Sequence, residues 1–221
     1  MAVQPDGSSS AAARPRQHVR PTVTAGPATS AHPSPEGWRH DGLLLADGTR
    51  VRFRPINHDD RDLVAALFGR MSETSRLRRY LSPKQELAPR ELDYLTDIDH
   101  ITHHAIAAVD ERDGSIVAIG RYVADATRTG VADLAAEVID ELQNMGIGTA
   151  LAKATLGRAA VNGFQLATAT TAWDNRAARA LLRKLGFRAR KSGGGIIEHE
   201  LRLSPAPSHP LTAAPAGGVA A

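Results

Sequence analysis

The chain has 221 residues, no cysteine, and 27 basic against 24 acidic residues, which gives a formal net charge of +3. The absence of thiols excludes disulfides, thiolate metal ligands and a covalent acyl-cysteine intermediate, and so small a charge excess argues against a nucleic-acid partner. No segment approaches the roughly 20 apolar residues of a membrane span, and the N-terminal residues lack the apolar stretch of a secretory signal. We therefore expect a cytoplasmic protein that makes no membrane contact.

Proline marks the edges of the expected domain. Only three of the 13 prolines lie between residues 42 and 203. Residues 1–41 and 204–221 are rich in Ala, Pro, Ser and Gly, a composition that cannot bury enough apolar surface to offset the entropy of ordering. We therefore expect two disordered tails around a single domain at residues 42–203, which is long enough for one core of ordinary size.

Hydrophobic periodicity and turn residues predict a series of strands and helices. The predicted elements, in chain order, are a hairpin at 43–46 and 50–54, a helix capped by Asn57, helices at 72–81 and 90–95, an antiparallel pair of strands at 104–109 and 116–123, a strand at 131–139, a helix ending near Asn162, a strand at 165–171, a helix at 175–185 and a strand at 196–203. The run from Arg76 to Tyr80 is the densest basic stretch, and we interpret it as the solvated face of its helix.

Residues 138–151, VIDELQNMGIGTAL, form the most informative segment of the chain. They predict the end of a strand, a turn with two glycines and the first turns of a helix. A helix N-terminus offers backbone N–H groups and the positive end of a dipole, and Gly146 and Gly148 leave room for a ligand. We therefore expect an anionic ligand, a phosphate by default. The segment lacks the third glycine of a dinucleotide fingerprint and the lysine of a P-loop.

Residues 143–148 read Q-x-x-G-x-G, and residues 175–187 read N-x-x-A-x-x-L-x-x-x-x-G-F. Both motifs resemble blocks of the GNAT N-acetyltransferase superfamily, the first of them its acyl-CoA pyrophosphate loop. RFRPI at 52–56, MSETSRLRRY at 71–80 and LTDID at 95–99 are similar to the GNAT domain of bacterial protein lysine acetyltransferases. The resemblance implies an α/β fold with a mixed, mostly antiparallel sheet that is splayed between its fourth and fifth strands and covered by helices on both faces.

The resemblance also implies a donor site. Acetyl-CoA would lie in the opening of the sheet, where its pantetheine arm would bond to the backbone of Val138 and Ile139 and a nearby N–H group would hold the oxyanion. Asn175 would contact CoA, although it is also an ordinary N-cap. The alternative is a glycine-lined turn that only packs a helix against a strand. The residues expected to surround the pyrophosphate, chiefly through backbone N–H groups, are Gln143, Asn144, Met145, Gly146, Ile147, Gly148 and Thr149.

Two carboxylates are candidates for the base that deprotonates an acceptor amine. The resemblance places the base of related protein acetyltransferases at Asp133, one methylene shorter than the usual glutamate. Glu137 lies four residues further along, on the same face if the strand is regular, whereas a bulge would change its direction. The alternative is that either acid pairs with an arginine, for example Arg121.

The resemblance leaves the proton donor for the departing thiolate unassigned. Many relatives have a tyrosine in the last helix that protonates the thiolate, and Leu182 stands at that position here. A water molecule or Tyr122 would have to act as the proton donor instead. Some family members carry the base on the next strand, and the matching residue here is Thr170, which cannot serve as a base. The cluster of His100, His103 and His104 does not place three imidazoles on one side of a strand, so we interpret these residues as loop and strand histidines and expect no metal.

Together these observations predict an N-acetyltransferase that uses acetyl-CoA as its co-substrate and transfers the acetyl group directly to a primary amine in a ternary complex. A protein lysine is the acceptor most consistent with the resemblance. Two alternatives stay open: a small-molecule amine N-acetyltransferase, and a catalytically weak CoA-binding regulatory domain. The sequence does not indicate an oligomeric state.

Overall fold

The computed structural model describes residues 42–204, apart from the side chains of residues 191 and 192. The strands and helices are β1 (Leu43–Leu44), β2 (Arg50–Pro55), α1 (Arg61–Arg70), α2 (Glu73–Tyr80), α3 (Pro89–Thr96), β3 (His103–Asp110), β4 (Ile116–Ala124), β5 (Val131–Val138), α4 (Ile147–Val161), β6 (Leu166–Ala172), α5 (Arg176–Lys184), β7 (Arg188–Gly193) and β8 (Ile196–Arg202). Short 3-10 turns precede α1 and follow β5. The two predicted tails lie outside the described residues, and no helix within those residues is long and apolar enough to cross a membrane.

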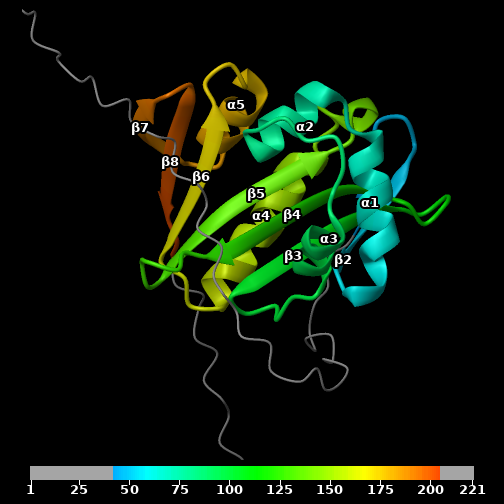
Figure 1. The fold of residues 1–221 in the computed structure, drawn as a ribbon, viewed down its shortest axis with the longest axis horizontal. Helices are drawn as coiled ribbons and strands as arrows, with labels where there is room; N and C mark the ends of the chain where they lie inside the picture. The colour runs from blue at the N-terminus through cyan, green and yellow to red at the C-terminus, as the bar shows by residue number, and fades with distance from the viewer. Residues whose placement is uncertain (1–41, 205–221) are drawn as a thin grey trace, which may run out of the picture. The chain divides into compact units, whose positions relative to one another are not determined.

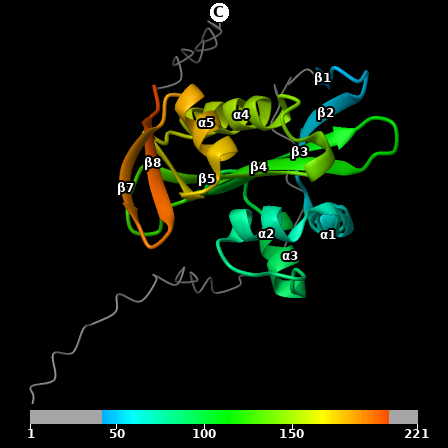
Figure 2. The same ribbon diagram turned by 90° about the horizontal axis from the view of Figure 1, so that it is seen from above.

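All described strands join one sheet in the order β1-β2-β3-β4-β5-β6-β8-β7. Every neighbouring pair is antiparallel except β5 and β6, which are parallel. Helices α1, α2 and α3 cover one face, called the front face below, and α4 and α5 cover the back face (Figures 1 and 2). Within residues 42–204, α2 also contacts β6, and no helix lies in front of β8 and β7 (Figure 1). The predicted α/β architecture is therefore confirmed.

The sheet opens where its two parallel strands diverge. β5 and β6 are paired only from Val131 to Asp133 and from Leu166 to Thr168. The rest of β5, up to Val138, keeps its antiparallel partner β4 but has no ladder to β6. This is the predicted splay, and it lies between β5 and β6 because the two-residue β1 adds a strand to the count.

The core holds the opening in place from the back. Every residue of β3 is buried, and α4 packs on the back of the sheet through residues that include Leu151 and Leu156. The helix comes close because β4 carries Gly120, where a Cβ atom would lie 2.7 Å from the hydroxyl oxygen of Thr155. A larger residue there would push α4 away and displace its N-terminus, which lies beside the opening.

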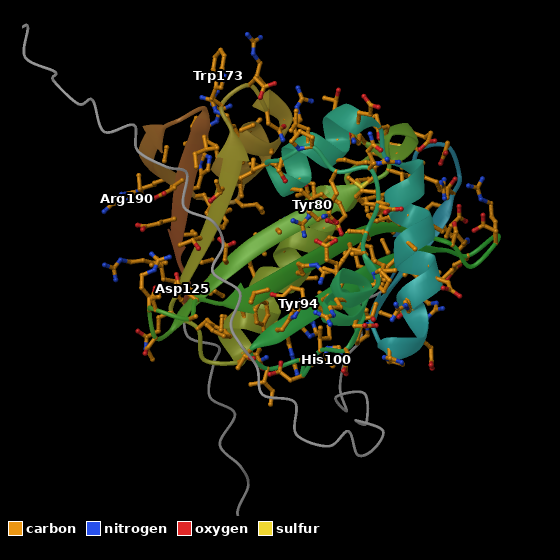
Figure 3. The ribbon with its side chains drawn as sticks, in the orientation of Figure 1. Tyr80, Tyr94, His100, Asp125, Trp173 and Arg190 are labelled. Atoms are coloured by element: carbon orange, nitrogen blue, oxygen red, sulfur yellow. The ribbon has the colours of Figure 1, made fainter. Side chains whose placement is uncertain are left out.

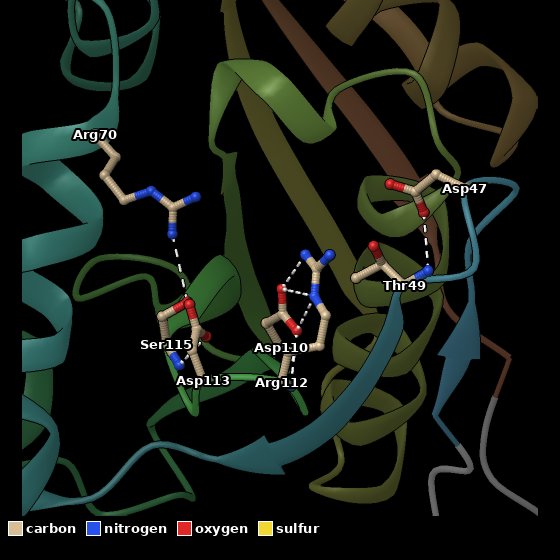
Figure 4. A network of polar contacts seen from close by, with 7 residues as sticks. All are labelled: Asp47, Thr49, Arg70, Asp110, Arg112, Asp113 and Ser115. Carbon is tan, nitrogen blue, oxygen red and sulfur yellow. Dashed lines mark hydrogen bonds and ion pairs between the residues drawn. The ribbon is translucent and has the colours of Figure 1, made fainter.

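The end of the sheet remote from the opening is held by polar turns. Figure 4 shows Arg112 Nη2 donating to the carboxylate of Asp110 at 2.7 Å, and Arg70 reaching the hydroxyl of Ser115 at 3.4 Å. The carboxylate of Asp47 accepts from the N–H of Thr49 at 2.9 Å in the β1–β2 turn (Figure 4). These contacts close tight turns between antiparallel strands, so we assign them a structural role.

One strand was not predicted. The edge strand β7 has the sequence RARKSG and pairs only with β8. It has no alternation of apolar and polar residues, because its outer edge and much of its surface face water. A cationic edge strand of this kind also resists pairing with other chains.

Candidate active site

The first wall of the opening is the N-terminus of α4. Gly146 is its N-cap residue and has φ of +92°, a left-handed conformation that glycine adopts without strain. No side chain of the described residues caps this helix end. The first N–H groups of a helix have no intrahelical acceptor, so those of Ile147, Gly148 and Thr149 remain available to an anion.

Two side chains of this loop, those of Met145 and Ile147, pack inward, whereas Gln143 and Asn144 are exposed. Ile147 is fully buried, and Met145 packs against the main core cluster. A Cβ atom on Gly148 would lie 3.6 Å from Val138 and 3.8 Å from Leu181, which places this glycine where β5, α4 and α5 meet. At residues 145–148 the inward packing leaves the backbone as the exposed part of the loop, and its role toward a ligand stays a prediction.

The second wall is the free edge of β5. The backbone N–H of Ile139, which was expected to face this opening, points to the other side of the strand. The N–H of Ile139 donates to the carbonyl of Val117 on the β4 side at 3.0 Å, and the Ile139 side chain is buried in the core. Ile139 therefore cannot supply a backbone donor to a ligand in the opening. Because backbone groups alternate along a strand, the polar groups of Val138 face the opposite edge. The carbonyl of Val138 indeed accepts from Gln143 Nε2 at 3.1 Å.

Helix α2 lies across the mouth of this opening and contacts both β5 and β6. None of its residues is buried, and polar contacts tie it down on both sides. Gln143 donates to the hydroxyl of Ser75 at 3.2 Å, and Arg78 reaches Asp174 at 3.3 Å, just before α5. The carboxylate of Asp140 accepts from the hydroxyl of Ser75 at 2.8 Å. Hydrogen bonds and ion pairs thus hold much of this helix, and Tyr80 at its end also packs edge-on against Phe68 of α1.

The basic run on α2 is not the solvated face that the sequence suggested. Arg79 forms an ion pair with Glu137, and the Arg79 side chain is only 14% exposed. Arg76 donates to the carbonyl oxygens of Phe68 and Gly69 at 3.1 and 3.0 Å. The arginines were misread because a short helix with few apolar residues gives no periodic signal for its inner side.

The two candidate carboxylates lie on the front face, as predicted for a regular strand. The β4–β5 register runs without interruption from Ala118–Val138 to Ala124–Ala132, so residues 133 and 137 point the same way. Asp133 lies at the last β5–β6 pair, directly before the strands diverge, and its carboxylate accepts from the hydroxyl of Thr168 at 2.9 Å. It is half-buried.

Glu137 is in a different situation. Its side chain is 2% exposed and is held by the guanidinium of Arg79. Burial by itself lowers the pKa of Arg79, but Glu137, Tyr80 and Asp133 together oppose this effect, so the pKa is raised. The expectation that one acid pairs with an arginine is right in kind, but the partner is Arg79 of α2 rather than Arg121. Glu137 is thus fixed by an ion pair, whereas Asp133 bonds to the hydroxyl of Thr168.

Aromatic side chains complete the front face. Tyr80 and Tyr94 lie over the same side of the sheet (Figure 3), and burial raises the pKa of both phenols. Tyr94 contacts the ring of His103, with centroids 4.9 Å apart. Neither tyrosine was predicted as a site residue, although Tyr80 ends the stretch MSETSRLRRY, which carried the only available signal.

A sequence model of the acetyltransferase (GNAT) family matches residues 73–187, from α2 to the end of the second motif. The chain belongs to the GNAT family. It is 33% identical over 145 residues to an acetyltransferase of Pseudomonas aeruginosa, a match that covers 65% of this chain and 77% of that protein. Membership of this family makes it an acyl-CoA-dependent N-acyltransferase.

Two further proteins are similar to the chain. Acetyltransferase Pat of Mycolicibacterium smegmatis is 28% identical over 120 residues, which are 54% of this chain and 36% of that protein. The chain thus matches about a third of that relative's length. The GNAT domain of S. lividans PAT has a similar fold, with a TM-score of 0.68 and 23% identity over 73% of this chain and 96% of that one.

In the present chain, Tyr122 is not placed to act as the substitute proton donor. Tyr122 is fully buried, and its hydroxyl donates to the carbonyl of Ile101 at 3.0 Å and accepts from Asn162. It packs with Phe164 on the α4 side, away from the front-face carboxylates, and burial raises its pKa to about 12. Leu182 is a core residue at 6% exposure, as its apolar helix face suggested.

The remaining predicted residues have local roles. The side-chain oxygen of Asn175 accepts from the N–H of Ala178 at 3.1 Å, so Asn175 is the N-cap of α5. Nδ1 of His100 lies 3.0 Å from Nδ1 of His104, whereas His103 bonds to Arg121. Thr170 is exposed on β6.

Proposed function

We propose that this GNAT domain transfers an acetyl group from acetyl-CoA directly to a primary amine, most consistently the side chain of a protein lysine. One observation carries the proposal: the free part of β5 has the uncapped α4 N-terminus at one end and Asp133 at the other. A single strand would thereby position both the anionic acetyl-CoA and the base Asp133. A site built on a strand holds its groups more precisely than one built on loops.

The donor would be bound mainly by backbone. Its pyrophosphate would accept from the first N–H groups of α4, around Gly146 and Gly148, and its pantetheine arm would bond to Val138. Gln143 now donates to the Val138 carbonyl, so it would have to yield that position. The N–H of Val138 would then face the thioester oxygen and stabilise the oxyanion.

The acceptor chemistry would depend on Asp133. A lysine with pKa of about 10.4 is neutral in roughly one molecule in a few thousand at pH 7, so a base is needed. Asp133 lies five residues from Val138, about 16 Å along the strand, so it would take the proton through intervening water molecules. The amine nitrogen would form a bond to the acyl carbon, and the carbon–sulfur bond would break. The CoA thiolate has an ordinary thiol pKa of about 8.5, so it can leave as an anion without a tyrosine donor. Because the chain has no cysteine, no acyl-cysteine precedes this step.

Two features support a protein acceptor over a small amine. The sequence stretches at 52–56, 71–80 and 95–99 resemble protein lysine acetyltransferases, and the chain is similar to Pat and PAT proteins. Among residues 42–204, no helix is drawn in front of β8 and β7 (Figure 1), an arrangement that favours a large partner over an enclosed small-molecule pocket.

The test is an acceptor competition. The full chain is incubated with acetyl-CoA, a library of lysine-containing peptides and folded proteins, and a panel of polyamines, aminoglycosides and amino acids. Mass spectrometry identifies acetylated products while free CoA is measured. Acetylated lysine in the protein arm supports the proposal, and turnover restricted to small amines contradicts its acceptor.

A second candidate is a CoA-binding regulatory domain with little catalysis. The buried Leu182, at the position where the resemblance places a tyrosine donor, favours it. Binding of acetyl-CoA in calorimetry without CoA release on any acceptor would support this candidate and reject acetyl transfer.

A further inference from the structure

Arg121 is a buried cation with one open edge. It lies at the centre of the front face on β4 and is 3% exposed. Its Nη1 atom donates to the carbonyl of Leu95 at 3.3 Å and contacts Nε2 of His103 at 3.1 Å. Its Nε and Nη2 atoms are buried as well, yet no acceptor among the described residues lies within hydrogen-bonding distance of them.

This arrangement is energetically incomplete. An ionised group removed from water is costly unless it is paired, and unused donors add to that cost. Burial lowers the pKa of Arg121, but an arginine starts so high that it stays charged. Burial, together with the charge of Arg121, also lowers the pKa of His103 to about 3. His103 is therefore a neutral acceptor for Nη1 and supplies no balancing charge.

The nearby acids are held by other groups. Glu137, the diagonal neighbour of Arg121 in the ladder, is bound by Arg79. Asp133, the diagonal neighbour on the other side, accepts from Thr168. Neither carboxylate is within hydrogen-bonding distance of the Nε and Nη2 edge.

The open edge has a specific chemical complement. Nε–H and Nη2–H point in parallel along one side of the guanidinium plane, which is the geometry that binds a carboxylate through two hydrogen bonds. The ladder places Arg121 opposite Ala135 on β5 and Ala105 on β3, so the neighbouring side chains in its row are small. Helix α2, which also lies on this face, is held in part by exposed hydrogen bonds that can exchange, such as those of Ser75 to Asp140 and Gln143.

We propose that Arg121 is the carboxylate-binding subsite of this GNAT domain and selects a reactant that carries a carboxylate. The inference rests on the proposed function. Arg121 stands one strand behind the free edge of β5, a separation of about 4.8 Å, so a group attached to a reactant at that edge can reach it. The carboxylate belongs either to the acyl group, as in a dicarboxylic acyl-CoA, or to the acceptor.

The first arm of the test measures donor binding and needs no turnover. Calorimetry compares acetyl-CoA with succinyl-CoA for the wild type, for Arg121→Gln and for Arg121→Lys. A bidentate, charge-assisted contact predicts that the wild type prefers succinyl-CoA by about 10- to 100-fold and that Arg121→Gln loses this preference. Arg121→Lys keeps the positive charge but cannot form two parallel hydrogen bonds, so it is expected to lose most of the preference for succinyl-CoA.

The second arm measures acceptor binding to protein saturated with CoA. Two lysine peptides are compared that differ only in Asp against Asn beside the lysine. A preference for the Asp peptide that disappears in Arg121→Gln assigns the carboxylate to the acceptor. The same loss in the first arm alone assigns it to the acyl group.

The matched control is Arg158→Gln on α4, another partly buried arginine with an unpartnered Nε atom, which lies on the back of the sheet. It should leave both preferences unchanged. Wild-type protein that binds acetyl-CoA but shows no carboxylate preference in either arm overturns the proposal. An equal loss in Arg158→Gln overturns it too. If Arg121→Gln does not fold by circular dichroism, Arg121→Lys decides. Binding is measured throughout, so a failure of acetyl transfer itself remains a separate result.

Discussion

The two sides of β5 are built in different ways. Its free edge and the neighbouring α4 N-terminus present backbone groups, while the side chains of Met145 and Ile147 are directed into the core. Its front face presents charged side chains, in which Glu137 is tied to Arg79 and Asp133 to Thr168. A site made of backbone is specified by fold and glycine, whereas a site made of side chains is specified by every residue around it.

This difference explains why the backbone edge of β5 can be common to many sequences, whereas the side chains of its front face differ between proteins. CoA is the same molecule for every member of the family, so a backbone cradle can serve many sequences. The acceptor differs among members, so the side chains that face it are free to differ. The following variants test whether the two sides of β5 are functionally separate.

The largest expected effect is on the front face. Asp133→Asn removes the proposed base, and general base catalysis typically contributes about 100- to 10,000-fold. We expect kcat to fall by a factor in this range while the Kd for acetyl-CoA, measured by calorimetry, stays the same. Glu111→Gln, an exposed acid in the β3–β4 turn, is the control and should leave both quantities unchanged. If Asp133→Asn keeps wild-type kcat, Asp133 is not the base.

The next effect concerns stability. Glu137→Gln leaves the buried Arg79 without its counter-charge, and breaking a buried pair in this way costs about 3 to 5 kcal/mol. The free energy of unfolding in urea should fall by this amount. The control is Asp93→Asn, which breaks the more exposed pair between Arg61 and Asp93 and should cost about 1 kcal/mol or less. Equal losses in the two variants would show that the Arg79–Glu137 pair behaves as a surface contact.

The same contrast separates what the sequence could and could not predict. The order of most strands and helices and the place of Gly146 before α4 follow from periodicity and turn residues, and the opening in the sheet follows from the family resemblance. The pairing of Arg79 with Glu137 joins residues 58 positions apart, and no local pattern carries it. The predicted partner, Arg121, was inferred from strand adjacency, but α2 brings a different arginine.

Two smaller errors have the same origin. The backbone of Ile139 was expected, with that of Val138, to bond to CoA, but the direction of its N–H group depends on strand phase, which the hydrogen bond to the Val117 carbonyl fixes. Strand β7 was missed because an edge strand can be polar on both faces. Long-range pairing therefore limits the prediction more than local propensity does.

The third prediction addresses the donor side. Gly146→Val forces a β-branched residue into a left-handed conformation and disturbs the N–H groups that precede α4. Loss of one charge-assisted hydrogen bond corresponds to about 10- to 100-fold, so the Kd for acetyl-CoA should rise by this factor in calorimetry. Gly157→Ala in the exposed middle of α4 is the control, and we expect unchanged affinity with unfolding made about 0.5 to 1 kcal/mol harder. A normal Kd in Gly146→Val would place the pyrophosphate elsewhere.

The smallest effect is on the pH dependence of stability. Burial and Arg121 lower the pKa of His103 to about 3, whereas an unfolded histidine titrates near 6.5. The unfolded state therefore binds the proton first, so the stability due to neutral His103 is complete above pH 6.5 and is lost as the pH falls toward 3. Between these values one histidine contributes a slope of about 1.4 kcal/mol per pH unit.

His103→Gln keeps an oxygen that can accept from Arg121 but removes the titration. Urea unfolding between pH 4.5 and 6 should therefore show a slope that is smaller by up to about 1.4 kcal/mol per pH unit. His104, on the back face, also has its pKa lowered to about 3, by burial first and by His100 next. His104→Gln should reduce the slope by a similar amount, but only His103→Gln alters the surroundings of Arg121 and hence the carboxylate preference. If both variants change that preference equally, the front and back faces of the sheet are not independent, and the effect on Arg121 cannot be assigned to its contact with His103.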